Sequence, residues 1–211
     1  EPAVEKAGSL IRENWKQPKS LGYKGRADLV TETDWAVERE LKKSLGSILP
    51  QAEFLAEESA IGQDLGGTSW IVDPLDGTTN FAHSLPVVAV SVALWTEGTV
   101  QLGVIHLPLL GETFTASKGG GSKLNGEPIR VSSNEGIEDS LIATGFPYNI
   151  EERAETELER LRRVLLSARG VRRMGAAAVD LAYTACGRFE AFYEVGLKPW
   201  DTAAGWLLVQ E

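Results

Sequence analysis

The segment 70–81, with the sequence W-I-V-D-P-L-D-G-T-T-N-F, constrains the fold of this chain more than any other. Its apolar start is typical of a strand, and Pro74 keeps the preceding residue, Asp73, out of helical geometry. We therefore expect the strand to end at Asp73 and a tight turn to bring Asp76 back toward it. Gly77 permits a close approach of the backbone, and the two threonines that follow favour the start of a short helix.

Two carboxylates beside a helix N-terminus can hold a phosphate group and a divalent cation together. The free N–H groups of the first helical turn attract an anion, and carboxylate oxygens are ligands that Mg²⁺ prefers. An acidic surface turn would show the same pattern, so the segment alone leaves both interpretations open.

Composition narrows the range of functions. Lys and Arg total 21 against 30 Asp and Glu, a net charge of −9 that lacks the basic footprint of a nucleic-acid-coating protein. A small anionic substrate stays compatible, because a bound divalent cation reverses the local charge. The single cysteine, Cys186, permits no intrachain disulfide and indicates a reducing compartment, so we expect a cytoplasmic protein. No apolar run reaches the ~20 residues that span a bilayer.

Hydrophobic periodicity predicts helices and strands in alternating blocks. Helices are expected over residues 3–15, 34–49, 151–167, 176–186 and 201–210, and strands over residues 53–55, 69–72, 87–95, 100–107, 113–117, 140–144, 170–173 and 189–193. Thr31 with Asp34 resembles a capping box, Asn125-Gly126 predicts a hairpin, and Gly187 suits the position after a helix end. The chain begins without a methionine and stops within an apolar helical pattern, so we expect it to be clipped at both ends.

Three further segments carry an acid that could belong to the same site. They are A-E-E-S at residues 56–59, K-P-W-D-T-A-A at residues 198–204, and A-D-L-V-T-E-T-D at residues 27–34. Together with segment 70–81, they resemble the inositol monophosphatase family, within the wider group of lithium-sensitive, Mg-dependent sugar and nucleotide phosphatases. The resemblance runs in order from about Asp28 to Gln210.

The resemblance implies a mixed α+β and α/β fold, a layered α-β-α-β-α sandwich of the inositol monophosphatase and fructose-1,6-bisphosphatase type. Residues 1–134 would form an N-terminal α+β lobe that carries most metal ligands. Residues 135–211 would form a C-terminal α/β lobe, and the two lobes together would make one compact catalytic unit.

Residue types exclude other routes to phosphate-ester hydrolysis. Cys186 lacks the phosphate-loop spacing of a cysteine phosphatase, and the two histidines are poor nucleophile candidates, since His106 reads as structural and His83 as a residue near the site rim. The D-x-x-D spacing differs from the D-x-D of aspartyl-phosphate enzymes, and the chain has no G-x-x-x-x-G-K-[ST] loop. A water nucleophile activated by metal ions in carboxylates remains.

By resemblance, two or three Mg²⁺ ions bind in the active site. Glu57, Asp73 and the backbone carbonyl of Leu75 would hold the first ion. Asp73, shared with the first, would hold the second together with Asp76 and Asp201. Glu57 would also serve a loosely bound third ion.

The resemblance also assigns the catalytic groups. Glu57 and Thr78 would orient the attacking water, and Asp34 would accept a hydrogen bond from the Thr78 hydroxyl. Glu58 is the weaker candidate of the adjacent glutamate pair and reads as a supporting or surface acid. The alternative for Asp34 is that it only caps its helix.

Substrate contacts are expected from Asp76, Gly77, Thr78, Gly175, Ala177, Glu194 and Arg172. The N–H groups of Gly77 and Thr78 would hold the phosphate, while Glu194 and the backbone of Ala177 would contact polyol hydroxyls. Arg172 would bind a second anionic group or form an ion pair between subunits. The family often has Ser or Thr where this chain has Ala176, which loosens the substrate assignment.

The sequence thus predicts a Mg-dependent phosphomonoesterase that hydrolyses inositol monophosphate to inositol and phosphate. The resemblance adds lithium sensitivity and a homodimer, with no membrane association. Fructose 1,6-bisphosphate, histidinol phosphate and a 3′-phosphoadenosine nucleotide stay open as alternative substrates. A non-catalytic role in binding the transcription machinery, as in some bacterial relatives, is the second alternative.

Overall fold

The computed structural model describes residues 1–17, 21–23, 29–59 and 67–211, so that Ala27 and Asp28 of one predicted motif lie outside the described residues. The helices are α1 (Pro2–Asn14), α2 (Glu32–Ile48), α3 (Thr78–Ala82), α4 (Ile150–Ser167), α5 (Ala177–Ala185) and α6 (Pro199–Gln210), with a 3-10 turn at Ile137–Asp139. The strands are β1 (Leu21–Tyr23), β2 (Leu29–Thr31), β3 (Glu53–Ala56), β4 (Thr68–Asp76), β5 (Ala89–Thr96), β6 (Thr99–Leu107), β7 (Glu112–Ser117), β8 (Gly121–Leu124), β9 (Glu127–Pro128), β10 (Leu141–Thr144), β11 (Gly170–Arg172) and β12 (Ala191–Tyr193).

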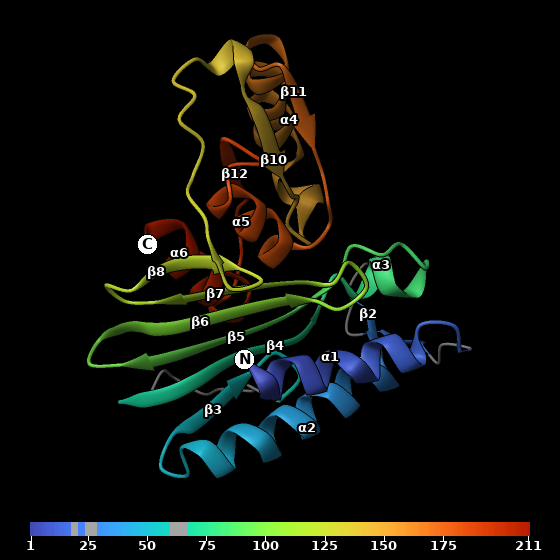
Figure 1. Ribbon diagram of the computed structural model, residues 1–211. Coiled ribbons are helices and arrows are strands. Elements are labelled where there is room, and N and C mark those ends of the chain that lie inside the picture. Colours follow the sequence, from blue (N-terminus) through green and yellow to red (C-terminus); the bar gives the residue numbers. More distant parts are fainter. Residues whose placement is uncertain (18–20, 24–28, 60–66) are drawn as a thin grey trace.

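The elements stack in layers, as Figure 1 shows. Helices α1 and α2 cover one face of a seven-stranded sheet with the order β3-β4-β5-β6-β7-β8-β9, and α5 and α6 cover the other. A parallel sheet with the order β11-β10-β12 lies beyond α5, with α4 on its outer side. This arrangement confirms the predicted layered α-β-α-β-α fold.

The periodicity of α2 explains how the first layer attaches to the sheet. Val37, Leu41 and Leu45 recur every four residues and are buried in one apolar cluster with the sheet. The predicted capping box is confirmed, because Thr31 Oγ1 accepts from the helix and the Asp34 side chain accepts from the Thr31 N–H. Helix α2 therefore begins at a fixed point, which also fixes the position of Asp34.

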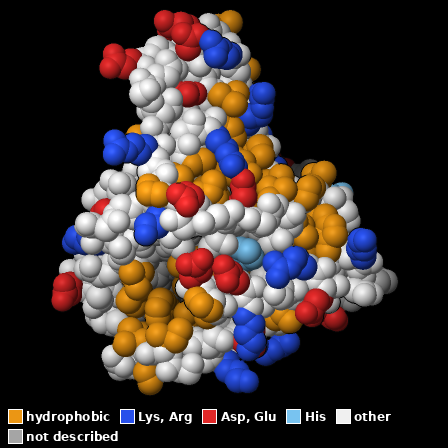
Figure 2. All heavy atoms as spheres, in the orientation of Figure 1, with side chains coloured by type: hydrophobic (Ala, Val, Ile, Leu, Met, Phe, Trp, Pro, Cys, Tyr) orange, Lys and Arg blue, Asp and Glu red, His pale blue; other side chains and the backbone are white. Residues whose placement is uncertain are grey.

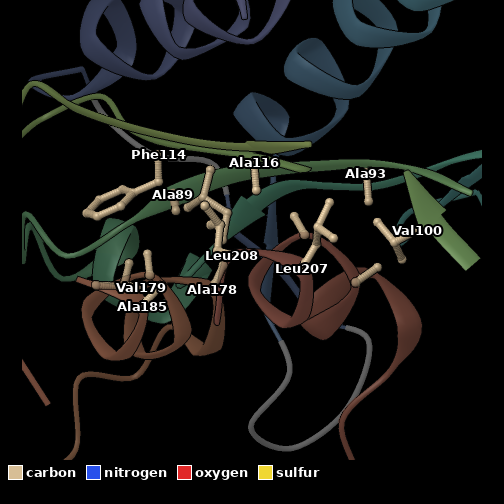
Figure 3. Close-up of a cluster of buried hydrophobic side chains, with 14 of the residues drawn as sticks. Ala89, Ala93, Val100, Phe114, Ala116, Ala178, Val179, Ala185, Leu207 and Leu208 are labelled. Atoms are coloured by element: carbon tan, nitrogen blue, oxygen red, sulfur yellow. The ribbon is translucent and has the colours of Figure 1, made fainter. Parts of the chain in front are cut away.

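The second core lies between the sheet and the α5–α6 layer. In Figure 3, side chains of the sheet such as Ala93 and Phe114 meet those of the helices such as Leu207. Gly103 on β6 allows the backbones to approach closely, since a Cβ there would lie 2.9 Å from the carbonyl oxygen of Ala204. Helix α6 is thus packed tightly on the sheet, and its first turn is held at the edge where the strands end.

Strand β4 is longer than predicted. It pairs with β5 as far as Asp73, opposite Ser91, and after a shift in register it pairs again at Asp76, opposite Ala89. The prediction that the strand ends at Asp73 is wrong. Pro74 has no N–H to donate, and it is accommodated in an irregularity inside the strand.

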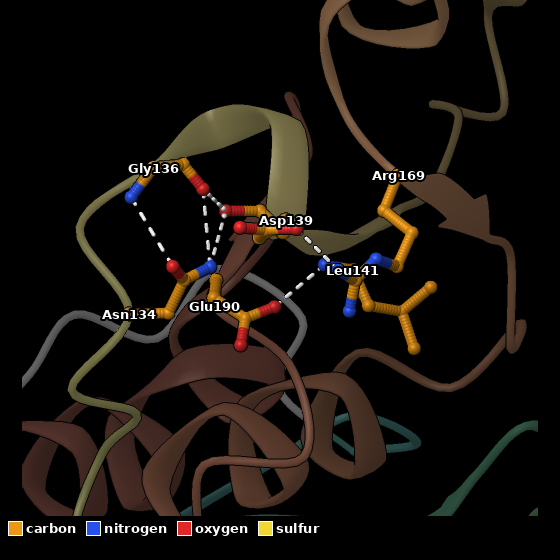
Figure 4. A network of polar contacts seen from close by, with 7 residues as sticks. Asn134, Gly136, Asp139, Leu141, Arg169 and Glu190 are labelled. Carbon is orange, nitrogen blue, oxygen red and sulfur yellow. Dashed lines mark hydrogen bonds and ion pairs between the residues drawn. The ribbon is translucent and has the colours of Figure 1, made fainter.

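Polar contacts secure the connection between the two sheets (Figure 4). Asn134 exchanges hydrogen bonds with Gly136, donating from Nδ2 at 3.0 Å and accepting at Oδ1 at 3.2 Å. Glu190, just before β12, accepts from the Leu141 N–H and, at 2.9 Å, from the Ser132 hydroxyl. These contacts tie the connection and strand β10 to the start of β12.

The surface carries charges of both signs. Figure 2 shows Lys, Arg, Asp and Glu side chains scattered over one face, with hydrophobic side chains gathered where the narrower upper part joins the broader lower part. Within the described ranges, none of the helices combines the length and the hydropathy that crossing a membrane demands.

Candidate active site

Glu57 and Asp73 are brought side by side by the parallel pairing of β3 with β4. Ala56 pairs with Val72, so the next residue of each strand lies at the same carboxyl-terminal edge of the sheet. The N–H of Glu57 donates to the carbonyl of Val72 at 3.1 Å, which continues the pairing by one residue. Both acidic side chains line the same pocket, whereas Glu58 is buried and does not line it.

Three aspartates of this pocket are oriented by backbone N–H groups. One carboxylate oxygen of Asp73, of Asp76 and of Asp201 accepts such a hydrogen bond. The donors are the N–H groups of Leu75, Ala178 and Lys198, at 3.0, 2.7 and 2.6 Å respectively. The bond to Ala178 ties the end of β4 to the first turn of α5, and the bond to Lys198 caps α6.

Burial is the main cause of the raised pKa values in this group. The pKa of Asp73 lies well above its ordinary value, because the side chain is buried and nearby carboxylates repel its charge. Burial, followed by repulsion from Asp201, raises the pKa of Asp76 to about 8. Burial raises the pKa of Asp201 to about 6, against the hydrogen bond from the Lys198 N–H. Burial and mutual repulsion thus disfavour the ionised forms of these acids, and a bound cation would stabilise them.

The donor chemistry fits a hard divalent cation. Mg²⁺ takes oxygen ligands and usually keeps several waters, so a few carboxylates and a carbonyl suffice. In the described part of the chain, no hydrogen bond engages the second oxygen of Asp73, Asp76 or Asp201. Within the described residues, no three Asp, Glu, His or Cys side chains lie close enough together to coordinate a metal ion as they stand. Glu57, Asp73, Asp76 and Asp201 line the same pocket, and their role as metal ligands is a proposal.

Helix α3 begins where the sequence predicts. Its N-cap, Gly77, has a φ of +88°, a conformation that favours glycine, and a Cβ there would lie 2.9 Å from the carbonyl of Val87. The first N–H groups of a helix have no partner within it, and Gly77, Thr78 and Thr79 all line the pocket.

Thr78 connects the pocket to the buried acid Asp34. The Thr78 hydroxyl lies 2.9 Å from Asp34 Oδ1 and 3.0 Å from the carbonyl of Leu75, either of which can accept its proton. The other oxygen of Asp34 accepts from the N–H and the hydroxyl of Thr31. Asp34 is fully buried, and burial raises its pKa while these hydrogen bonds lower it. The carboxylate thus caps α2 with one oxygen and accepts from Thr78 with the other.

Apart from Asp34, these groups line one cavity of about 500 Å³. We call Glu57, Asp73, Asp76 and Asp201 the acidic end. The cavity is lined by Glu57, Asp73, Leu75, Asp76, Gly77, Thr78, Thr79, Gly145, Phe146, Pro147, Tyr148, Ile150, Arg173, Gly175, Ala176, Ala177, Glu194, Val195, Gly196, Leu197, Lys198, Trp200 and Asp201.

Further lining residues come from the C-terminal half of the chain, among them the cations Arg173 and Lys198. We call Gly145, Arg173, Gly175 and Glu194 the far wall. Of the predicted substrate residues, Gly175, Ala177 and Glu194 line the cavity, but Arg172 is exposed and does not. The adjacent residue, Arg173, lines it instead.

Sequence reasoning missed Asn80 and Asp180. Asn80 is buried in α3, and its Nδ2 donates to the carbonyls of Val87 and Met174 at 2.8 and 2.9 Å, which fixes the segment before α5. Asp180 is buried on α5, and one of its carboxylate oxygens has no hydrogen-bond partner among the residues that the structure describes. Asn80 stands in segment 70–81 but was given no role there, and Asp180 stands in no motif, although an apolar helix with one acid is a signal that could have pointed to it.

The two histidines lie outside the cavity lining. His106 is buried, and its Nδ1 is 2.9 Å from the hydroxyl of Thr113 on the neighbouring strand. His83 is exposed at the end of α3.

Comparison with known proteins agrees with this geometry. The profile of the Inositol monophosphatase family matches residues 1–211. The Nus factor SuhB of Escherichia coli K12 is 40% identical over 215 residues, which cover 99% of this chain and 79% of the relative. The Inositol-1-monophosphatase of Rhizobium meliloti is 41% identical over 215 residues, covering 99% and 80%. The crystal structure of the extragenic suppressor protein suhB from Bartonella henselae has a TM-score of 0.93 at 42% identity and covers 100% of this chain and 82% of that one.

Proposed function

Because this chain belongs to the inositol monophosphatase family, we propose that it is a Mg²⁺-dependent phosphomonoesterase that hydrolyses inositol monophosphate to inositol and phosphate. One observation carries the proposal. The cavity brings four carboxylates together with a threonine whose hydroxyl lies 2.9 Å from a buried aspartate. Such a set supports phosphoryl chemistry, which needs charge neutralisation and an oriented water.

In this proposal the acidic end holds the metal. Glu57, Asp73 and the carbonyl of Leu75 form one binding position, and Asp73, Asp76 and Asp201 form a second. When bound, Mg²⁺ neutralises phosphoryl charge and makes a water molecule more acidic. The backbone hydrogen bonds to the three aspartates support these assignments, because they hold each carboxylate in place and leave its second oxygen for a ligand.

Thr78 and Glu57 orient the attacking water. When the Thr78 hydroxyl donates to ionised Asp34, its oxygen lone pairs are left to accept a hydrogen bond from that water. Glu57 accepts a hydrogen bond from the other O–H group of the water. The N–H groups of Gly77 and Thr78 hold the phosphate, as helix N-termini do for anions.

The leaving group occupies the side of the cavity away from the acidic end. In this proposal the Glu194 carboxylate accepts hydrogen bonds from polyol hydroxyls, and the backbone N–H of Ala177 donates one. Glu194 lines the cavity on the segment that follows β12, which supports the assignment.

A substrate panel tests the proposal. Phosphate release is measured with inositol 1-phosphate, fructose 1,6-bisphosphate, histidinol phosphate and 3′-phosphoadenosine 5′-phosphate, with Mg²⁺ and with excess EDTA. We expect the highest kcat/KM for inositol 1-phosphate and none in EDTA. A higher kcat/KM for fructose 1,6-bisphosphate or histidinol phosphate would favour the alternative of a sugar or metabolite phosphatase. Inhibition by Li⁺ and a homodimer in light scattering belong to the same proposal.

The name of one group of relatives favours a second candidate. The Escherichia coli relative is called a Nus factor, and so is the one from Pseudomonas aeruginosa, at 41% identity. Binding to the transcription machinery is therefore the second proposed function, in addition to hydrolysis or in place of it. Pull-down of transcription proteins by the wild type and by Asp73→Asn tests it, because binding without turnover separates the two roles.

A further inference from the structure

Arg173 and Glu194 line the same cavity without forming an ion pair. In the part of the chain that the structure describes, the guanidinium of Arg173 makes no hydrogen bond and no ion pair, and the carboxylate of Glu194 makes none either. Both arginines are exposed in part, but Arg172 does not line the cavity and donates to the carbonyl of Val171. A donor and an acceptor are therefore both available on the far wall.

Glycines allow both charged groups to lie against the backbone of the wall. A Cβ at Gly145 would collide with the Glu194 carboxylate, and a Cβ at Gly175 would lie 3.1 Å from Arg173 Nη1. Gly175 also has a φ of +79°, which disfavours any other residue. The two side chains thus occupy space that a larger residue at either glycine would fill.

The charges around this pair are mainly acidic. The charge of Arg173 acts on Glu194 and on the buried Asp180, and it lowers the pKa of both. Glu194 also experiences repulsion from Asp201, and burial raises its pKa to about 7. These carboxylates would repel a second anion placed beside Arg173, whereas they would not repel a neutral hydroxyl.

We propose that Arg173 is a specificity-determining residue that reads a hydroxyl of the leaving group together with Glu194. The hydroxyl oxygen accepts from the Arg173 guanidinium, and its proton is donated to the Glu194 carboxylate. The leaving group is thus a polyol rather than an apolar alcohol or a second anion. This inference rests on the proposed function, and it adds Arg173 to the residues that the family resemblance assigns.

Two adjacent arginines provide a matched experiment. Arg173→Gln and Arg172→Gln are compared on inositol 1-phosphate and on p-nitrophenyl phosphate, whose leaving group has no polyol hydroxyls. Losing a hydrogen bond from a charged donor weakens binding by about 10- to 100-fold. We expect Arg173→Gln to lower the ratio of kcat/KM on inositol 1-phosphate to that on p-nitrophenyl phosphate by this factor, mainly through KM. Arg172→Gln should leave the ratio unchanged.

The double variant tests whether both residues contact one hydroxyl. If they do, Arg173→Gln/Glu194→Gln should be little worse than the more damaged single variant, because groups that act together are not additive. If the losses of the two single variants multiply in the double variant, the inference that both residues contact one hydroxyl is overturned. An equal loss on both esters would overturn the specificity role, and a larger loss on fructose 1,6-bisphosphate would overturn it in favour of a second anion.

Calorimetric binding of inositol 1-phosphate separates this inference from the proposed function. A wild type that binds the ester but releases no phosphate would overturn the hydrolysis, and Arg173→Gln would still report on hydroxyl recognition through its Kd. A wild type that neither binds nor hydrolyses the ester would overturn both. Melting temperatures of all variants show whether a loss comes from misfolding.

Discussion

At the acidic end of the cavity, Asp73, Asp76 and Asp201 each accept a hydrogen bond from a backbone N–H group. At the far wall, neither Arg173 nor Glu194 makes a hydrogen bond within the described residues. The first set is held by the scaffold before any ligand arrives, whereas the second set has its hydrogen-bonding capacity unused. Preorganised groups serve the chemical step, and unsatisfied groups serve recognition.

This difference gives a simple expectation. Changes at the acidic end and at Thr78 should mainly lower kcat, because they remove interactions that strengthen in the transition state. Changes at the far wall should mainly alter KM and the choice of substrate. The comparison fails if a far-wall substitution costs as much kcat as one at the acidic end.

The largest effect is expected from Asp73→Asn. Its carboxylate lies at the centre of the acidic end, where it is proposed to be shared by two metal positions. Activity should fall by at least about 10³-fold, more than the usual loss of one preorganised electrostatic contact. Phosphate release at saturating Mg²⁺ measures it, and Asp139→Asn, at an exposed acid, is the control. If Asp73→Asn keeps near-normal activity while Asp201→Asn does not, the sharing is assigned to the wrong residue.

Thr78→Ala and Asp34→Asn should follow, each with a loss of roughly 10²–10⁴-fold in kcat, the range for a positioned proton acceptor. Substrate affinity should change much less, because the phosphate contacts come from metal and backbone. The double variant should be little worse than either single variant, since the two residues are joined by one hydrogen bond of 2.9 Å.

The alternative for Asp34 is capping alone. One oxygen of Asp34 does cap α2 through Thr31, and losing a cap costs about 1 kcal/mol of stability. Melting temperatures measured beside the kinetics separate the two roles. An active Asp34→Asn with a lowered melting point, or multiplicative losses in the double variant, would leave Glu57 as the sole base.

The acidic end and the far wall differ in how well the sequence predicts them, because they are built from different kinds of segment. Two of the four acids of the acidic end, Asp73 and Asp76, stand in one contiguous segment whose turn residues determine the local backbone, and the other two each stand in a short motif of their own. The layers of the fold were also predictable, because α2 and the long strands have clear periodicity. The end of β4 was not, since a proline can terminate a strand or sit in an irregularity, and only the pairing of Asp76 with Ala89 decides between them.

The far wall joins segments that are distant in sequence, so local patterns say little about it. Arg172 and Arg173 are adjacent and identical, and the backbone direction after β11 decides which one lines the cavity. Gly145 gave no signal either, because its role depends on Glu194, 49 positions later, lying against it. Such residues become visible only in three dimensions.

Gly145→Ala tests the far wall without removing a charge. The new methyl group would collide with the Glu194 carboxylate and displace it from its place in the cavity. We expect KM for inositol 1-phosphate to rise about 10-fold, the effect of one lost hydrogen bond to a charged group, with kcat nearly unchanged. Gly46→Ala is the matched control, because a Cβ there meets nothing within 4 Å. A large loss of kcat in Gly145→Ala would mean that the far wall also positions the reacting groups.

The last expected effect is on stability and not on activity, and it comes from Asp180→Asn. Burial, followed by repulsion from Asp76, raises the pKa of Asp180 to about 8, against about 3.9 in an unfolded chain. Between these values the folded state binds more protons than the unfolded state, so the free energy of unfolding falls as pH rises from about 4 to about 8. Asn cannot ionise, and the variant should therefore lose this part of the pH dependence. In EDTA, urea unfolding of the variant and the wild type should give similar stabilities at pH 5 and a variant more stable by on the order of 2 kcal/mol at pH 8. Asp139→Asn removes only an exposed ion pair with Arg169 and should therefore change stability little at either pH. An Asp180→Asn protein that keeps the full pH slope would show that Asp180 is already ionised in the folded protein and that its charge is compensated.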